Sequence, residues 1–240
     1  MRNPAGETCC FDEEKHRYTV NGTELTSATR FVGSFFPEFD KESISKKYAD
    51  KHRMAQAEVL AKWKAINEES TRMGSLVHSY CEHKALQKLS QFDLECLTDD
   101  DQSRCRAADM AFEDLQKRFN VVDAEKIVFD SFIGLAGTID LLLEDVESNA
   151  IIIFDWKTNR RILKSNFFGK VANLPIDFLD DCNYNEYCLQ LNVYRLILIR
   201  QGYFPGKNIR MALTHLMPDK YQPYRVPCME SVIEKMLAWV

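Results

Sequence analysis

The chain has 240 residues, a formal net charge of −5 and 45% hydrophobic residues. This length and composition suit one large domain with a full core. The acidic balance argues against a general nucleic-acid coat protein, which is usually basic, but it is compatible with a local basic groove. The sequence has no N-terminal apolar run and no stretch of ~18 apolar residues, so we expect no signal peptide and no membrane segment. We therefore expect an intracellular protein, in the cytoplasm, the nucleus or an organelle, and not a secreted one.

Eight cysteines are spread along the chain without a C-x-x-C pair, which argues against a zinc ribbon. Four thiolates could come from Cys182, Cys188 and Cys228 together with Cys9 or Cys10. Because this spacing matches no ferredoxin-like run, we expect reduced thiols rather than an iron–sulfur cluster.

The N-terminal segment predicts a β-hairpin followed by a short helix. Residues 11–26 contain Asn21-Gly22, the strongest two-residue hairpin signal, and Ser27 is placed to cap a helix that runs to residue 34. Four phenylalanines accompany this helix: Phe31, Phe35, Phe36 and Phe39. They are expected to belong to the core or to a lid, or else to form a platform on which unpaired bases stack.

A helical part is predicted next. The expected elements are helices at 41–67 and 68–89, a polar loop at 91–101 and a helix at 101–119. Asp40 is placed to cap the first helix. The buried stripe of the last helix is expected to be Ala107, Met110, Ala111, Leu115 and Phe119.

The second of these helices carries a candidate ligand. Gly74, His78 and Glu82 follow one another at four-residue spacing and therefore share one helix face. The glycine would let a backbone or a ligand approach closely. The histidine is either a hydrogen-bonded core residue or a metal ligand, and the spacing alone leaves both interpretations open.

Residues 134–161 are the stretch around which the rest is organised. The expected strands are 126–132, 138–143 and 150–154, a three-strand meander. Glu125 opens the first strand, Asp140 lies inside the second, Asp155 ends the third, and Lys157 follows. Because side chains alternate along a strand, Asp155 and Lys157 share one face, and a neighbouring strand can bring Asp140 beside them.

Two carboxylates held close together repel unless a cation lies between them. Carboxylate oxygens suit Mg²⁺ or Mn²⁺. A lysine beside such an ion could orient water and offset developing negative charge on a phosphate. The alternative interpretation is an ordinary ion pair between Asp155 and Lys157 that closes a hairpin.

A basic segment follows the lysine. Its members are Thr158, Asn159, Arg160, Arg161 and Lys164. It is either a solvated loop or a rim that contacts phosphates. A helix at 185–201 then carries Gln190 and Tyr194 on one face, where they form an internal polar network or contact a phosphate or a base. The remaining expected elements are a strand at 209–217, an edge strand at 224–226 and a closing helix at 230–239.

Four motifs in this order resemble the RecB-type, Cas4-like branch of the PD-(D/E)XK nuclease superfamily. They are G-x-x-x-H from Gly74, G-x-x-D from Gly137, D-x-K from Asp155 and Q-x-x-x-Y from Gln190. The N-terminal YTVNG hairpin also resembles that of stand-alone phage, viral or mitochondrial genome-maintenance exonucleases. The resemblance implies an α/β fold with a restriction-endonuclease-like core, in which helices flank a central mixed β-sheet, together with an N-terminal β-hairpin and a helical insertion.

The resemblance also implies a metal site with one or two Mg²⁺ or Mn²⁺ ions. The implied ligands are His78, Asp140, Asp155 and the carbonyl of Trp156. Many relatives have glutamate where Asp155 stands, so the shorter arm would alter the reach to the metal. Glu82 and Glu125 would stand behind these ligands or hold a second ion.

For catalysis, the resemblance implies that Lys157 positions the attacking water and stabilises the phosphorane-like state, beside Asp140 and Asp155. Gln190 and Tyr194 would contact the nucleic-acid strand or the lysine. The basic segment would bind the strand.

We therefore expect a metal-dependent deoxyribonuclease, most simply an exonuclease on single-stranded or free-ended DNA, with RNA still open. The alternatives are an endonuclease directed by structure or sequence, and a non-catalytic DNA-binding subunit of a replication, repair or defence complex. We expect a single domain, residues 1–240. Its parts are an N-terminal segment (1–40), a helical part with the histidine (41–120), a catalytic core (121–217) and a closing segment (218–240).

Overall fold

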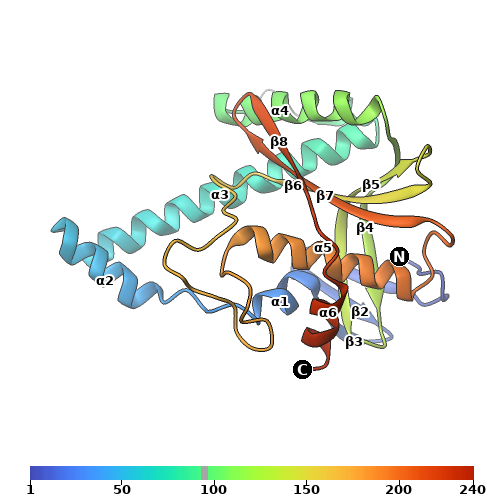
Figure 1. Cartoon of the computed structure of the whole chain (residues 1–240). Helices are drawn as coiled ribbons and strands as arrows, with labels where there is room; N and C mark the ends of the chain where they lie inside the picture. Colours follow the sequence, from blue (N-terminus) through green and yellow to red (C-terminus); the bar gives the residue numbers. More distant parts are fainter. Residues whose placement is uncertain (93–96) are drawn as a thin grey trace.

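A computed structural model describes residues 1–92 and 97–240 and shows a mixed β-sheet between helices (Figure 1). The strands in this part of the chain are β1 (Cys9–Asp12), β2 (Arg17–Val20), β3 (Thr23–Ser27), β4 (Asn120–Asp130), β5 (Leu135–Asp145), β6 (Ala150–Lys157), β7 (Asn208–Met217) and β8 (Lys220–Arg225). The helices are α1 (Ala28–Gly33), α2 (Lys41–His52), α3 (Gln56–Ala85), the 3₁₀ turn η1 (Leu89–Gln91), α4 (Asp99–Gln116), α5 (Asn183–Arg200) and α6 (Glu230–Leu237). The expected α/β architecture is confirmed.

The sheet combines antiparallel and parallel pairs. Strands β4, β5 and β6 form the expected antiparallel meander. Strand β7 runs parallel to β6, and β8 returns antiparallel to β7. Strand β3 joins the sheet by a short parallel pairing of Thr26 and Ser27 with the start of β5.

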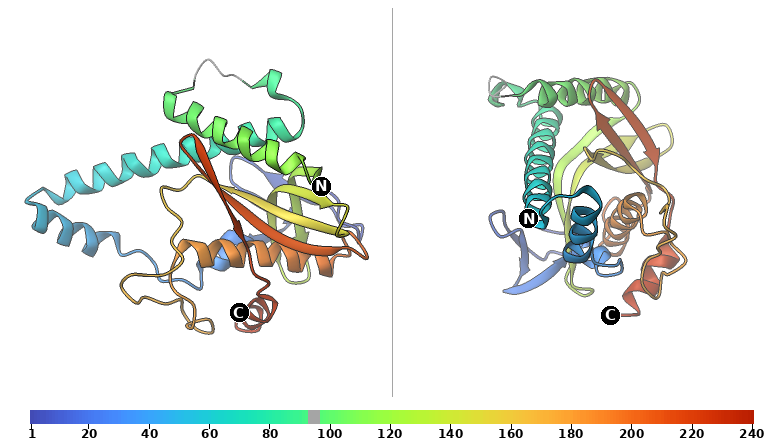
Figure 2. Two further views of the ribbon diagram at one scale, coloured as in Figure 1. Left: turned by 45° about the horizontal axis from the view of Figure 1, so that its top comes forward. Right: turned by 90° about the vertical axis from the view of Figure 1, so that its left-hand side faces the viewer.

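Helices cover both faces of the sheet. One core cluster joins α1 and α5 to residues such as Ile151 and Ile153, and a second joins α3 and α4 to Phe154 and Trp156. Figure 2 shows α3 and α5 on opposite sides of the strands. Because side chains alternate along a strand, β6 is buried on both faces and its sequence is almost continuously apolar up to Asp155.

The N-terminal hairpin is confirmed. Asn21 and Gly22 have φ values of 51° and 81°, the left-handed conformation that a two-residue hairpin turn requires. The Ser27 side chain accepts a hydrogen bond from Arg30 N and caps α1, as expected. The additional strand β1 pairs with β2 and was missed, because its short CCFD sequence has no clear alternation.

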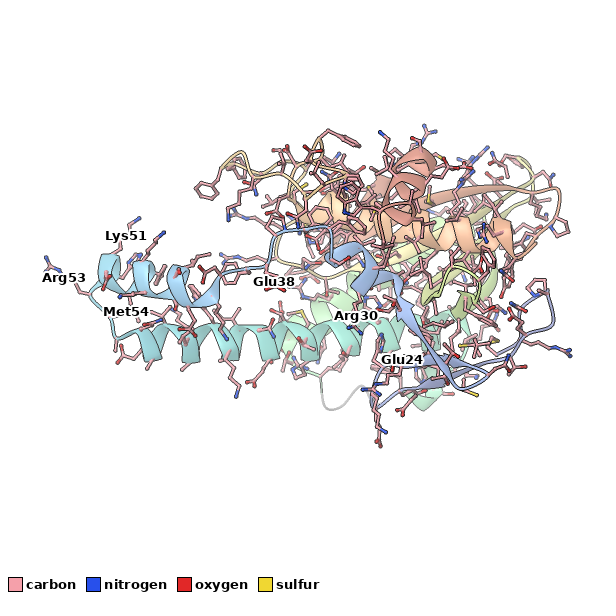
Figure 3. All side chains as sticks on the ribbon, turned by 90° about the horizontal axis from the view of Figure 1, so that it is seen from below. Glu24, Arg30, Glu38, Lys51, Arg53 and Met54 are labelled. Atoms are coloured by element: carbon pink, nitrogen blue, oxygen red, sulfur yellow. The ribbon has the colours of Figure 1, made fainter. Side chains whose placement is uncertain are left out.

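The helical part departs from the sequence prediction. The expected helices at 41–67 and 68–89 are instead α2, ending at His52, and one continuous α3 of 30 residues. The break is at Arg53, which adopts φ 55° and caps α2 with its N–H on Ala49 and Asp50 carbonyls. The break covers only residues 53–55 and contains no glycine or proline, so no strong sequence signal marks it. Figure 3 shows the α2–α3 hairpin extending away from the sheet, with Lys51, Arg53 and Met54 at its tip.

Several smaller predictions were also wrong. Met110 is 47% exposed rather than part of the buried stripe of α4. The edge strand is 220–225 rather than 224–226, and β4 begins at Asn120, so Glu125 lies inside it. The predicted loop at 91–101 gives way to α4 from Asp99, while its residues 93–96 lie outside the described residues.

The four phenylalanines of the N-terminal segment do not share one environment. Phe31, Phe35 and Phe36 are buried in the core cluster around α1 and α5, whereas Phe39 is 65% exposed and lies beside Trp63 of α3, with ring centroids 5.9 Å apart. The core interpretation therefore holds for the first three residues, and a stacking role remains only for Phe39.

Candidate active site

The site lies where β5 and β6 part. Their pairing ends at Leu141 and Phe154, so the following residues of β6 lose their partners on β5. Asp140 Oδ2 compensates by accepting a hydrogen bond of 2.9 Å from the backbone N of Trp156. The carboxylate thereby satisfies a buried donor and fixes its own position beside the end of β6.

Two further elements, α3 and β4, bring side chains to Asp140 on β5. Nδ1 of His78, from α3, lies 3.3 Å from Asp140 Oδ2. Glu125 comes from β4, and one ligand atom each of His78, Glu125 and Asp140 lie within 4.8 Å of one another. Glu125 has φ 48°, an uncommon value inside a strand, so the fold holds this carboxylate in place at a conformational cost.

Asp155 and Lys157 form the second half of the site. Lys157 Nζ donates a hydrogen bond of 3.0 Å to Asp155 Oδ1 and lies 2.8 Å from Oδ2. Both side chains are almost fully buried. Within the described residues, Oδ2 accepts no hydrogen bond of ordinary geometry despite the nearby ammonium, so this buried oxygen keeps a free lone pair. Asp155 is not among the three residues within 4.8 Å of one another.

The pKa values of two crowded carboxyl groups are raised. Burial, reinforced by the charge of Asp140, raises the pKa of Glu125 to about 8. Burial, opposed by Lys157 and reinforced by Asp140, raises the pKa of Asp155 to about 6. Glu125 therefore holds a proton near neutral pH when nothing else neutralises the site, whereas Asp155 is mostly ionised there and gains its proton only in mild acid.

The charged partners respond in the opposite sense. Burial would lower the pKa of His78, but the charge and hydrogen bond of Asp140 outweigh burial and raise that pKa to about 9. Burial would raise the pKa of Asp140, but His78 holds it below its ordinary value. For Lys157, burial is outweighed by Asp155 and Asp140, which raise its pKa and keep the amine charged.

Helix α5 also contributes polar side chains near the site. Gln190 Nε2 donates to the hydroxyl of Tyr194 at 2.9 Å. The buried Tyr194 ring lies against Gly137 of β5, where an added Cβ would stand 2.4 Å from Cε1. The glycine of the G-x-x-D motif is therefore required by the tyrosine of the Q-x-x-x-Y motif, and the two motifs pack on each other.

Two residues around the lysine were missed. The ring of Tyr187 lies 4.5 Å from Lys157 Nζ, and its hydroxyl donates to Asn159 Oδ1 at 2.7 Å. His215, opposite Lys157 in the β6–β7 register, is buried, and its Nε2 hydrogen-bonds the carbonyl of Asn159. Tyr187 lies three residues before Gln190, so helical spacing could have found it. No sequence signal marks His215, because the β6–β7 pairing is long-range.

The remaining predicted residues surround this centre. Thr158 Oγ1 lies 3.5 Å from where a Cβ on Gly74 would be, so α3 approaches the chain leaving β6 closely. Arg160 and Arg161 are exposed, and Lys164 Nζ lies 5.1 Å from the ring of Tyr184. These residues border the site without forming its interior.

The side chains of Glu82 and Trp156 are not part of the three-residue group. The charge of Glu82 acts on Glu125, although Glu82 is not part of the three-residue group. The Trp156 side chain is buried against Phe112 and Phe154, so only its backbone can face the site. Neither residue changes the picture of a patch built around Asp140.

This arrangement fits a divalent cation. Three ligand atoms converge, and the pKa values of two carboxyl groups are raised. The buried Asp155 Oδ2 also has a lone pair without a hydrogen bond of ordinary geometry. A bound cation would stabilise these crowded carboxylates. Oxygen ligands with one imidazole suit Mg²⁺ or Mn²⁺.

Among the described helices, none combines the length and hydropathy that crossing a membrane demands.

Comparison with known proteins agrees with this chemistry. None of the curated proteins matches the chain. The family model described as "PD-(D/E)XK nuclease superfamily" matches residues 28–236, which include every element that contributes to the site. The chain therefore belongs to the PD-(D/E)XK nuclease superfamily.

Proposed function

We propose that this protein is an exonuclease that uses Mg²⁺ or Mn²⁺ to hydrolyse single-stranded or free-ended DNA. Membership of the superfamily implies metal-dependent phosphodiester hydrolysis. The observation that carries the proposal is the convergence of His78, Glu125 and Asp140 beside the buried pair of Asp155 and Lys157.

The metal would be held by side chains from three directions. His78, Asp140 and Glu125 offer converging ligand atoms, and Asp155 offers Oδ2, whose one close partner among the described residues is the Lys157 ammonium. The backbone carbonyl of Trp156 is a further oxygen ligand in this proposal. A bound cation supplies Lewis acidity and lowers the pKa of water, so that hydroxide forms near neutral pH.

Lys157 has the properties of an electrostatic catalyst. Its raised pKa keeps it charged, and Asp155 and Tyr187 fix its position. An ammonium held in a buried site offsets the negative charge that develops on the phosphoryl oxygens, and it can orient the attacking water. Tyr194 is buried, so we assign it the task of positioning Gln190, which then contacts the strand or the lysine.

Features of the α2–α3 hairpin support a single-stranded or free-ended substrate. Aromatic rings follow one another along it: Phe39, Trp63, Tyr48 and His52. A cavity of about 550 Å³ next to Phe39 and Trp63 is also lined by Lys41 and Lys64. Aromatic rings that stack bases beside cations that contact phosphates are the combination used to bind unpaired strands. Paired bases in a duplex would not expose these faces.

Two alternative functions are compatible with the same proposed metal site. An endonuclease would need room for a continuous strand on both sides of the scissile bond. A non-catalytic subunit of a replication, repair or defence complex would bind DNA without cutting it. We favour the exonuclease for two reasons. The charged Lys157 beside the converging ligand atoms of His78, Glu125 and Asp140 supports catalysis, and the aromatic hairpin suits a free end. These roles call for an intracellular protein.

Substrate topology decides between these functions. A 5′-labelled linear oligonucleotide and the same sequence closed into a circle are incubated with Mg²⁺, with Mn²⁺ or with EDTA. We expect stepwise shortening of the linear strand and an intact circle. A cut circle would establish the endonuclease, and binding without cleavage of either would establish the non-catalytic subunit. An RNA strand of the same sequence tests the choice of sugar.

A further inference from the structure

A second cavity, of about 890 Å³, lies at the outer edge of the sheet. Strand β8 pairs with β7 only from Ala212 onward, so the edge of β7 between Asn208 and Met211 is not covered by it. Beyond β8 the chain turns away toward α6 (Figure 1). The cavity surrounds this stretch, in which the carbonyls of Ile209 and Met211 accept hydrogen bonds from Arg195 Nε and Val226 N. Its volume is in the range of small-molecule sites, roughly 300–1,000 Å³.

Positive charge dominates the walls of this cavity. Four arginines line it: Arg118, Arg195, Arg210 and Arg225. Asp145 is the one carboxylate among its lining residues in the described part of the chain. The whole chain carries a net charge of −5, so this concentration runs against the background and creates a local positive potential.

The guanidinium groups have donors to spare. Arg118 and Arg210 share Asp145 Oδ2, at 3.3 and 3.7 Å. The Arg225 guanidinium forms no ion pair or hydrogen bond with any described residue. Each guanidinium carries five N–H donors, so one shared carboxylate leaves most of them for a ligand. Arg195 is the exception, because it is held by Glu230 at 3.0 Å and by the carbonyl of Ile209.

The rest of the lining suits a flat apolar body. Ile152, Met211 and Val226 contribute apolar surface, and Phe119 and Tyr224 are also among the lining residues. Guanidinium groups bind phosphate oxygens in pairs, and aromatic rings stack on bases. A nucleobase with attached phosphate meets both parts of this lining.

The cavity is separate from the metal patch, by which we mean the proposed metal site of His78, Glu125, Asp140 and Asp155. Charged and aromatic side chains lie between the two sites. Ile152 lies three residues before Asp155 on β6, which is roughly 10 Å along the strand. Tyr224 stands near Tyr184, with ring centroids 6.0 Å apart, and Lys164 Nζ lies 5.2 Å from the Tyr224 ring. Lys164 belongs to the basic segment that follows Lys157, so cations and rings continue from the site to the cavity.

We propose that the arginine-lined cavity is a second binding site, for a nucleoside phosphate. The phosphate is presented either by a nucleotide of the bound strand or by a free nucleotide released from it. The site itself follows from the cavity, whereas its connection to a strand rests on the proposed nuclease function.

The test uses the full chain in EDTA, so that binding is measured without cleavage. The probes are deoxyadenosine monophosphate, deoxyadenosine and a labelled ten-residue oligothymidylate, with calorimetry for the first two and fluorescence anisotropy for the third. The variant is the double change Arg210→Ala and Arg225→Ala, two exposed side chains whose loss leaves the core intact. The matched control is Arg17→Ala with Arg106→Ala, two exposed arginines outside the cavity.

We expect the variant to bind at least one phosphate-bearing probe about tenfold more weakly than the wild type, with the control unchanged and deoxyadenosine not bound. Weakened monophosphate binding identifies a free nucleotide as the ligand, and weakened oligonucleotide binding alone identifies the strand. Wild-type affinities of the variant for both probes would overturn the proposal. An acidic peptide is added as a competitor of the phosphate-bearing probes. If it displaced them as well as unlabelled deoxyadenosine monophosphate does, the proposal would also be overturned, because the cavity would then recognise only negative charge. Failure of the wild type to cleave DNA would refute the nuclease proposal while leaving this result standing.

Discussion

The metal patch and the α2–α3 hairpin place polar and aromatic groups under opposite conditions. Around the proposed metal site, His78, Asp140 and Lys157 are held by core elements and by one another, and their oppositely charged partners outweigh burial in shifting their pKa values. On the hairpin, the aromatic row stands on two helices that extend from the body (Figure 3). The patch can therefore stabilise charge in a fixed geometry, whereas the hairpin can only add contact area to a strand.

The largest effect should follow from Lys157→Ala. Removing the buried ammonium removes stabilisation of the phosphoryl charge, so kcat should fall about 10²- to 10³-fold. Binding of a single-stranded oligonucleotide should change little, because phosphates beyond the scissile bond are contacted elsewhere. Steady-state cleavage and fluorescence anisotropy measure the two quantities. The exposed Lys117→Ala is the control, and unchanged kcat in the Lys157 variant would refute the assignment.

Glu125→Gln should weaken metal binding in the patch. The amide keeps the size of the side chain but loses its charge, and we expect roughly 10- to 100-fold weaker Mn²⁺ binding by calorimetric titration. Asp123→Asn, on the same strand but paired with Lys126, is the matched control. If only Asp155→Asn, and not Glu125→Gln, weakened binding, Glu125 would return to a supporting place behind the ligands.

The affinity for Mn²⁺ should rise with pH. At pH 6.5 His78 and Glu125 hold protons, because their pKa values are about 9 and about 8, and these protons must leave when the ion binds. Affinity should therefore increase between pH 6.5 and 8.0, by about tenfold per pH unit for each proton released. Calorimetry in two buffers with different protonation enthalpies counts the protons. Equal affinity at both pH values would show that the patch is not a metal site.

The smallest effect should come from the hairpin. Trp63→Ala removes one stacking surface and should weaken oligonucleotide binding by about fivefold or somewhat more, since stacking contributes about 1–3 kcal/mol per base. Its urea midpoint should stay near the wild-type value, because Trp63 packs on hairpin residues rather than in the main core. Trp239→Ala, at an exposed C-terminal position, is the control. A large loss of kcat at saturating strand would contradict a purely binding role.

Local signals carried much of the fold. The Asn21-Gly22 turn and the Ser27 cap depend on interactions within a few residues, and the β4–β6 meander joins strands that follow one another in the chain, so the sequence predicted them correctly. The same holds for the spacing of Asp155 and Lys157, because alternation along one strand fixes their shared face. The break between α2 and α3 at residues 53–55 was not detected, because it is short and contains no glycine or proline.

The sequence by itself determined which side chains share a face, and it thereby singled out His78, Asp140, Asp155 and Lys157. Only the tertiary structure decided that Glu125 joins His78 and Asp140, and that Tyr187 and His215 fix the surroundings of the lysine. The reason is physical. Periodicity is a property of one element, whereas pairings such as β6 with β7, and the pKa shifts that follow from burial, depend on elements far apart in the chain.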